Sequence, residues 1–123
     1  MTPLGTSPIV PVSDPAASKA FYTETLKFEM VYDNLQYGYA LFRKAEALIA
    51  IVNAADDAAL TATRTNISAQ IWVSDIDALW AELRDGLSVL PEGRVRAPFT
   101  QSYGTREFHV KDPDGFLMLF TEA

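Results

Sequence analysis

The chain has 123 residues, of which 49% are hydrophobic and 21% charged, and its formal net charge is −6. This composition predicts one soluble globular domain with its own core and excludes a disordered chain. No apolar run is long enough for a membrane span. The acidic balance argues against a nucleic-acid partner, and the absence of cysteine and of a signal peptide favours a cytoplasmic protein without disulfides.

The first half of the chain predicts one helix and four strands. PIVPV (8–12) is typical of a short strand, and its prolines suggest a sheet edge or the start of a strand, because proline cannot donate a backbone hydrogen bond. Asp14 can cap the helix that follows, with Pro15 in its first turn and apolar residues at helical spacing as far as Leu26. Residues 53–66 are polar and alanine-rich, and we interpret them as a connector. The three strands between helix and connector are predicted at 28–33, 37–43 and 47–52.

The second half repeats this order. ISAQIWV (67–73) predicts a strand, and SDIDALWAELRDGL predicts a helix that ends near Gly86. Strand candidates follow within 89–99, 104–111 and 115–121, the last two joined by the turn Asp112-Pro113-Asp114-Gly115. Val-Ser-Asp precedes the helix in both halves. The sequence therefore predicts an α+β fold in one domain (1–123), with two tandem βαβββ modules at about 7–52 and 67–122 and the connector 53–66 between them.

PIVPVSDPAASKAFYTETLKFEMV resembles the opening of the vicinal oxygen chelate superfamily. This superfamily includes glyoxalase I, extradiol dioxygenases, fosfomycin-resistance enzymes and bleomycin-resistance proteins. IWVSDIDALWAEL and YGTREFHVKDPDGFLMLF look most like the bleomycin-resistance branch. The resemblance implies a mixed sheet that curls around a cleft, and a homodimer that completes two such clefts.

The resemblance also implies where metal-dependent relatives hold their ligands. In this chain those positions carry Ser7, Ser68 and Leu119, and the strand at 47–52 has no side chain able to bind a metal. A catalytic metal needs three or four nitrogen or oxygen ligands, so we expect no metal, no cofactor and no metal-dependent catalysis.

The only histidine, His109, offers no substitute site. With Glu122 it would supply only two ligands, and strand alternation groups it with Glu107 and Lys111 in a polar set. The chain has no cysteine, and no nucleophile neighbours this histidine in the sequence. We therefore expect no catalytic residue, and we interpret His109 as incidental.

A cleft without a metal is a ligand-binding site by default. Strand alternation turns Gln70, Trp72 and Leu119 toward it, and the segment 99–108 adds aromatic and basic groups. Tyr103 beside Gly104 is suited to stacking on a flat ligand. The candidate ligand-binding residues are Phe42, Gln70, Trp72, Phe99, Tyr103, Arg106, Phe108 and Leu119.

Three functions follow from this interpretation. The first is a metal-free protein of bleomycin-resistance type, which sequesters a planar or cationic small molecule in a dimer cleft. The second is a metal-dependent lyase, isomerase or dioxygenase of glyoxalase type. The third is a structural or regulatory dimer with a vestigial cleft.

Overall fold

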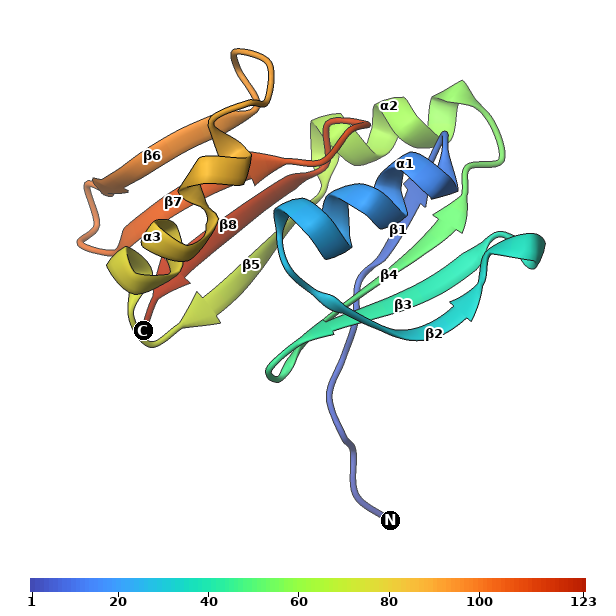
Figure 1. The fold of residues 1–123 in the computed structure, drawn as a ribbon, viewed down its shortest axis with the longest axis horizontal. Coiled ribbons are helices and arrows are strands. Elements are labelled where there is room, and N and C mark those ends of the chain that lie inside the picture. The colour runs from blue at the N-terminus through green and yellow to red at the C-terminus, as the bar shows by residue number, and fades with distance from the viewer.

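The computed structural model describes residues 1–123 as two modules, each built on a four-stranded sheet (Figure 1). The first sheet has the order β1-β4-β3-β2, from β1 (Ile9–Val12), β2 (Glu29–Asn34), β3 (Tyr39–Lys44) and β4 (Ala47–Asn53). The second has the order β5-β8-β7-β6, from β5 (Ser68–Val73), β6 (Val95–Thr100), β7 (Arg106–Lys111) and β8 (Leu117–Glu122). Only β1/β4 and β5/β8 pair in parallel. The predicted α+β fold of tandem βαβββ modules is confirmed, and the two sheets are not closed.

Each module carries its helix directly after its first strand. In both, the aspartate of the Val-Ser-Asp motif caps the helix: Asp14 before α1 (Pro15–Ala20) and Asp75 before α3 (Ile76–Leu87). Each carboxylate accepts a backbone N–H three residues on, which satisfies a donor that has no partner inside the helix. α1 continues into a π-helical turn, η1 (Phe21–Thr25). None of the helices combines the length and the apolar character that a membrane crossing requires.

The connector contains a helix that the sequence analysis did not predict, α2 (Asp57–Asn66). Asp56 caps it through a 2.9 Å hydrogen bond from the backbone N–H of Ala59. Only Thr63 is buried, so the helix has no apolar stripe for a periodicity search to find. We attribute it to the cap and to the helix propensity of its alanines.

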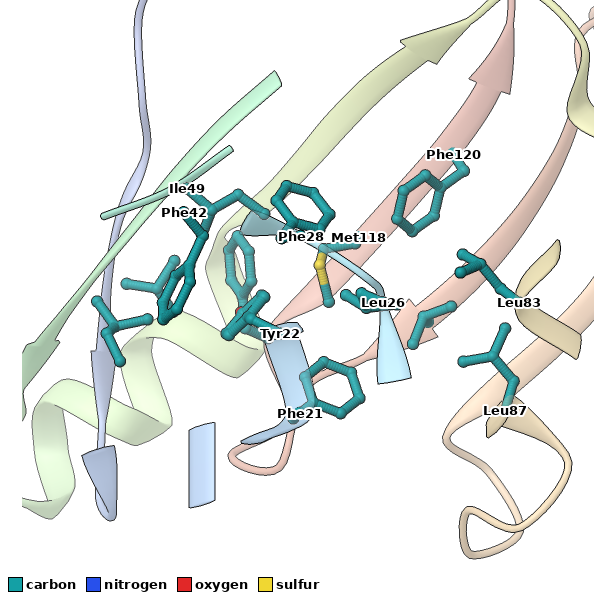
Figure 2. Packing of buried hydrophobic residues seen from close by; sticks show 14 of the residues in the cluster. Phe21, Tyr22, Leu26, Phe28, Phe42, Ile49, Leu83, Leu87, Met118 and Phe120 are labelled. Atoms are coloured by element: carbon teal, nitrogen blue, oxygen red, sulfur yellow. The ribbon is translucent and has the colours of Figure 1, made fainter. Parts of the chain in front are cut away.

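One hydrophobic core spans both modules (Figure 2). α1 and α3 cover the same side of the two sheets (Figure 1). Strand residues such as Phe42 and Phe108 are completely buried. Burying each large apolar side chain contributes roughly 1.5–3 kcal/mol. The core consists of Val10, Val12, Phe21, Tyr22, Leu26, Phe28, Ala40, Phe42, Ile49, Ile51, Ile76, Leu83, Leu87, Phe108, Val110, Phe116, Met118 and Phe120.

The last turn of each module contacts the helical segment of the other. In the turn before β8, Asp112 accepts a 3.1 Å hydrogen bond from the buried Tyr22 hydroxyl, and Asp114 accepts from the N–H and hydroxyl of Ser13. In the turn before β4, the Lys44 ammonium lies 3.0 Å from a carboxylate oxygen of Glu82 in α3. These reciprocal contacts fix the orientation of the two modules.

Candidate ligand-binding face

The second sheet has one face packed on α3 and one face free of helices. On β7, Phe108 and Val110 point into the core, so Glu107 and His109 point to the other side. We call this other side the open face of module two. It is formed by Ser68, Gln70, Trp72, Arg96, Phe99, Glu107, His109, Lys111, Leu117, Leu119 and Thr121.

Four of the eight predicted binding residues lie together on the open face of module two. Gln70 and Trp72 come from β5, Leu119 lies opposite Gln70 on β8, and Phe99 comes from β6. The Trp72 side chain is exposed, with 58% of its surface accessible. Tyr103, 71% exposed, lies on the loop between β6 and β7.

The other three predicted residues lie on the opposite side of the sheets, where each contacts another residue of the chain. Phe42 is completely buried and stacks on Tyr22 with the ring centroids 5.4 Å apart. Phe108 is completely buried and stacks on Phe120 at 4.9 Å. Arg106 shares the side of Phe108, where it binds Asp77 of α3 at 2.8 Å. Alternation within β7 separates the last two from Glu107 and His109.

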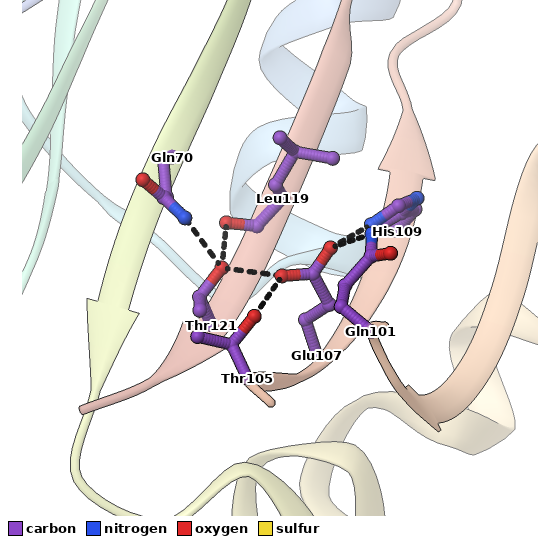
Figure 3. A network of polar contacts seen from close by, with 7 residues as sticks. All are labelled: Gln70, Gln101, Thr105, Glu107, His109, Leu119 and Thr121. Carbon is purple, nitrogen blue, oxygen red and sulfur yellow. Dashed lines mark hydrogen bonds and ion pairs between the residues drawn. The ribbon is translucent and has the colours of Figure 1, made fainter. Parts of the chain in front are cut away.

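At the centre of the open face of module two, the buried carboxylate of Glu107 collects hydrogen bonds (Figure 3). Its Oε1 lies 2.6 Å from Nε2 of Gln101 and 2.7 Å from Nε2 of His109. Its Oε2 lies 3.3 Å from the hydroxyls of Thr105 and Thr121. Every potential donor around this carboxylate is a side chain of module two.

The surroundings of Glu107 favour the ionised carboxylate. Burial raises its pKa, but the hydrogen bonds from Gln101, His109 and Thr121 outweigh this effect, and the net pKa is lower than usual. A carboxylate that accepts several hydrogen bonds holds its charge at neutral pH. The open face of module two is thus built on a buried negative charge.

Sequence reasoning missed this cluster and took His109 for an incidental residue. Alternation correctly grouped His109 with Glu107, but it could not indicate that Glu107 is buried. The cover comes partly from Gln101 and Thr105, whose place depends on the loop between β6 and β7. The His109 ring also lies edge-on to Phe99, with centroids 5.0 Å apart, so it is held on two sides.

The first sheet has an open face of a different kind. The open face of module one consists of Ile9, Pro11, Tyr32, Tyr39, Leu41, Arg43, Leu48, Ala50 and Val52. The rings of Tyr32 and Tyr39 lie 5.7 Å apart, and Ile9 is 63% exposed. This surface is mostly apolar and only partly exposed: Ile9, Tyr32 and Arg43 are exposed, Ala50 is buried, and the others are half-buried.

Trp72 lies where two grooves meet between the modules. One groove, of about 610 Å³, runs between the turn at 44–47 and the start of α3, and Trp72 and Phe120 help to line it. The other, of about 380 Å³, runs between β5 and the segment around Pro8, and Trp72 lines it as well. A flat molecule that stacks on Trp72 can therefore extend into either groove.

The residues at the family's metal positions do not fit a divalent metal. Ser68 and Leu119 lie on the open face of module two, Ser7 precedes β1, and Leu119 offers no donor atom. Glu122 uses Oε1 to accept the N–H of Ile76 at 3.1 Å, which helps to start α3. No three His, Asp or Glu side chains lie close enough together to hold an ion. We derive no metal chemistry for this site.

A sequence model of the Glyoxalase/Bleomycin resistance protein/Dioxygenase superfamily matches residues 6–120, so the chain belongs to this superfamily. Within it, the bleomycin-binding protein of Streptomyces verticillus, solved with copper(II)-bleomycin, is similar in fold and sequence. It has 27% identity and a TM-score of 0.79, and the match covers 100% of this chain and 98% of that one.

Two further solved structures share the fold. The bleomycin resistance determinant encoded on transposon Tn5 is 18% identical, with a TM-score of 0.75 and 95% of both chains covered. A lactoylglutathione lyase from Agrobacterium tumefaciens is 15% identical, with a TM-score of 0.67, covering 96% of this chain and 92% of that one. A search of curated protein sequences finds no match.

Proposed function

We propose that this protein binds a bleomycin-type small molecule and sequesters it without changing it chemically. The observation that carries the proposal is the full-length likeness, at 27% identity, to a protein solved with copper(II)-bleomycin. The exposed Trp72 supports it, because an aromatic side chain on an open sheet face is a platform for a flat ligand.

In this proposal the protein holds its ligand without a metal of its own. The residues at the family's metal positions, Ser7, Ser68 and Leu119, supply two hydroxyls and an aliphatic side chain. They leave stacking and hydrogen bonding as the means of recognition. The net charge of −6 attracts a cationic ligand at long range.

We further propose that the protein acts as a homodimer. The open face of module one is mostly apolar and partly exposed, and an exposed apolar surface favours association. A second copy would cover it and enclose the ligand between the open face of module one in one chain and that of module two in the other. Tyr32 and Tyr39 would then lie across the cleft from Trp72 of the second copy.

Isothermal titration calorimetry with metal-free and copper(II)-bleomycin tests the binding. We expect saturable binding by the natural chain and a loss of about tenfold or more in affinity for Trp72→Ala, because stacking contributes roughly 1–2 kcal/mol. Trp80→Phe is the matched control, because Trp80 packs on Phe108 away from the open faces. No heat of binding with either form of bleomycin would overturn the ligand assignment.

Sedimentation velocity, with and without the ligand, tests the dimer. We expect one dimeric species, and we expect Leu41→Glu on the open face of module one to shift it toward the monomer. A natural chain that stays monomeric at every concentration, with ligand bound, would contradict the dimer cleft.

A further inference from the structure

The hydrogen bonds around Glu107 determine which atoms the open face of module two presents to a ligand. An ionised carboxylate can only accept hydrogen bonds. Gln101 must therefore turn its amide nitrogen toward Oε1, as the 2.6 Å contact has it, and point its amide oxygen away. His109 must likewise donate from Nε2.

The same reasoning extends across β8 to Gln70. The Thr121 hydroxyl has one proton, and Glu107 Oε2 and the carbonyl of Leu119 both lie 3.3 Å from its oxygen. When the hydroxyl proton is donated to either of these oxygens, the Thr121 oxygen is left as an acceptor. Gln70 must then donate to it from Nε2, across a contact of 3.2 Å. The amide oxygen of Gln70 is then directed away from Thr121.

The outward atoms of these residues are available to a ligand. Gln70 is exposed, and neither Oε1 of Gln101 nor Nδ1 of His109 has a hydrogen-bond partner in the chain. The buried polar atoms without a partner are only Ser18 Oγ and Arg94 Nη2. Oε1 of Gln101 and Nδ1 of His109 therefore reach solvent.

The charges nearby decide between a cationic and a neutral donor. Arg96 lies opposite His109 on β6, with its guanidinium carbon 3.4 Å from the centroid of the Phe99 ring. Lys111 projects from the same face of β7. These two positive side chains offset the buried charge of Glu107 and disfavour a cation at this point.

We propose that this cluster is a subsite for a neutral, flat group rich in N–H donors, such as an aromatic carboxamide or an amino-heterocycle. The group stacks on Trp72 and donates to the amide oxygens of Gln70 and Gln101. A carboxylate in its place is disfavoured, because its oxygens would face the amide oxygens of Gln70 and Gln101. The subsite deepens the proposed function, since it assigns a ligand chemistry to the same open face.

The first test is the tautomer of His109 in the natural, full-length chain. It is the only histidine, so the ring signals in a nitrogen-15 spectrum at neutral pH belong to one residue. We expect Nε2 to carry a proton, as donation to Glu107 requires. A ring without a proton on Nε2 would overturn the proposal, because the hydrogen bonds around Glu107 would then be arranged differently.

The second test compares two probes of the same shape, quinoline-4-carboxamide and quinoline-4-carboxylate. We expect the carboxamide to bind the natural chain about tenfold more tightly, because the acid leaves acceptors facing acceptors. Glu107→Leu frees the surrounding side chains to rotate, and the preference should fall below about threefold. Asp77→Leu is the matched control, because it removes one carboxylate from the other side of the sheet, and it should keep the preference.

The outcomes separate this proposal from the proposed function. Equal affinity for the two probes, preference for the acid, or a preference that survives Glu107→Leu would overturn the subsite, even if bleomycin binds. A carboxamide preference lost only in Glu107→Leu would support the subsite, even if bleomycin does not bind. If Glu107→Leu does not fold, two measurements on the natural chain still test the subsite: the nitrogen-15 spectrum of His109 and the preference for the carboxamide over the carboxylate.

Discussion

The two modules share a topology but differ on their open faces. If the Val-Ser-Asp motifs are aligned, the paired row Pro11-Val52-Tyr39 corresponds to Trp72-Thr121-Glu107. The next row, Ile9-Ala50-Leu41, corresponds to Gln70-Leu119-His109. Apolar side chains fill most of the first set, whereas hydrogen-bonding side chains dominate the second.

The helix-facing sides of the two sheets, in contrast, are similar to each other. Both are filled by large buried apolar residues, such as Phe42 in module one and Phe108 in module two. The helix-facing residues are constrained by a shared core, whereas the open faces are not needed to cover it. Module one's open face therefore suits association, and module two's suits recognition.

The likeness of the helix-facing sides predicts the largest effect. We expect Phe42→Ala and Phe108→Ala each to lower the free energy of unfolding by about 3–5 kcal/mol, because each leaves a large cavity. Urea denaturation measures both. A small loss for either variant would place that residue on a ligand-facing surface, as the sequence analysis did.

The contact between the modules predicts the next effect. Asp112 accepts the backbone N–H groups of Asp114 and Phe116 as well as the Tyr22 hydroxyl. We expect Asp112→Ala to cost about 3 kcal/mol, because it leaves buried donors unsatisfied, and Tyr22→Phe to cost about 1 kcal/mol. Equal unfolding midpoints for Asp112→Ala and the natural chain would contradict this contact.

The Glu107 cluster predicts that the stability of the protein depends on pH. The folded pKa of Glu107 is lower than usual, so the unfolded chain binds the proton more readily, and its contribution to stability is lost as the pH falls through that folded pKa. Burial raises the pKa of Asp112. Asp112 therefore has the opposite effect on stability: its ionisation lowers the free energy of unfolding as the pH rises.

The difference between the natural chain and Glu107→Leu isolates the first contribution, because Asp112 is common to both. We expect the stability lost between pH 7 and about pH 3 to be larger in the natural chain by about 1 kcal/mol. Urea midpoints at a series of pH values measure it. If the urea midpoints of the two proteins changed in parallel with pH, the hydrogen bonds to the Glu107 carboxylate would not stabilise its ionised form.

The smallest effect on stability is expected at Trp72. Because its side chain is 58% exposed, Trp72→Ala should change the free energy of unfolding by about 0.5 kcal/mol or less. The same variant should lose most of its bleomycin affinity. A large loss of stability would make Trp72 a packing residue rather than a ligand platform.

The repeated fold was readable from sequence because its signals are local. The Val-Ser-Asp caps, the Asp-Pro-Asp-Gly turn and the alternating strands each depend on a few neighbouring residues. Alternation also placed Gln70, Trp72 and Leu119 on one face. Helix α2 was missed because it has no apolar stripe.

The candidate site was only partly readable because it depends on packing between distant segments. Burial of Glu107 requires the loop that carries Gln101 and Thr105. Phe108 was assigned to the cleft because alternation separates it from Glu107 and His109 but does not tell which side of β7 packs on α3.

The central claim, that the open face of module two binds the ligand, is tested most directly by the fluorescence of Trp72 alone. In the Trp80→Phe variant Trp72 is the only tryptophan, so its emission during titration with bleomycin reports on that face. The account predicts saturable quenching, with little change in Trp72→Phe, where Trp80 is the reporter. Emission from Trp72 that stays constant up to saturating bleomycin would contradict it.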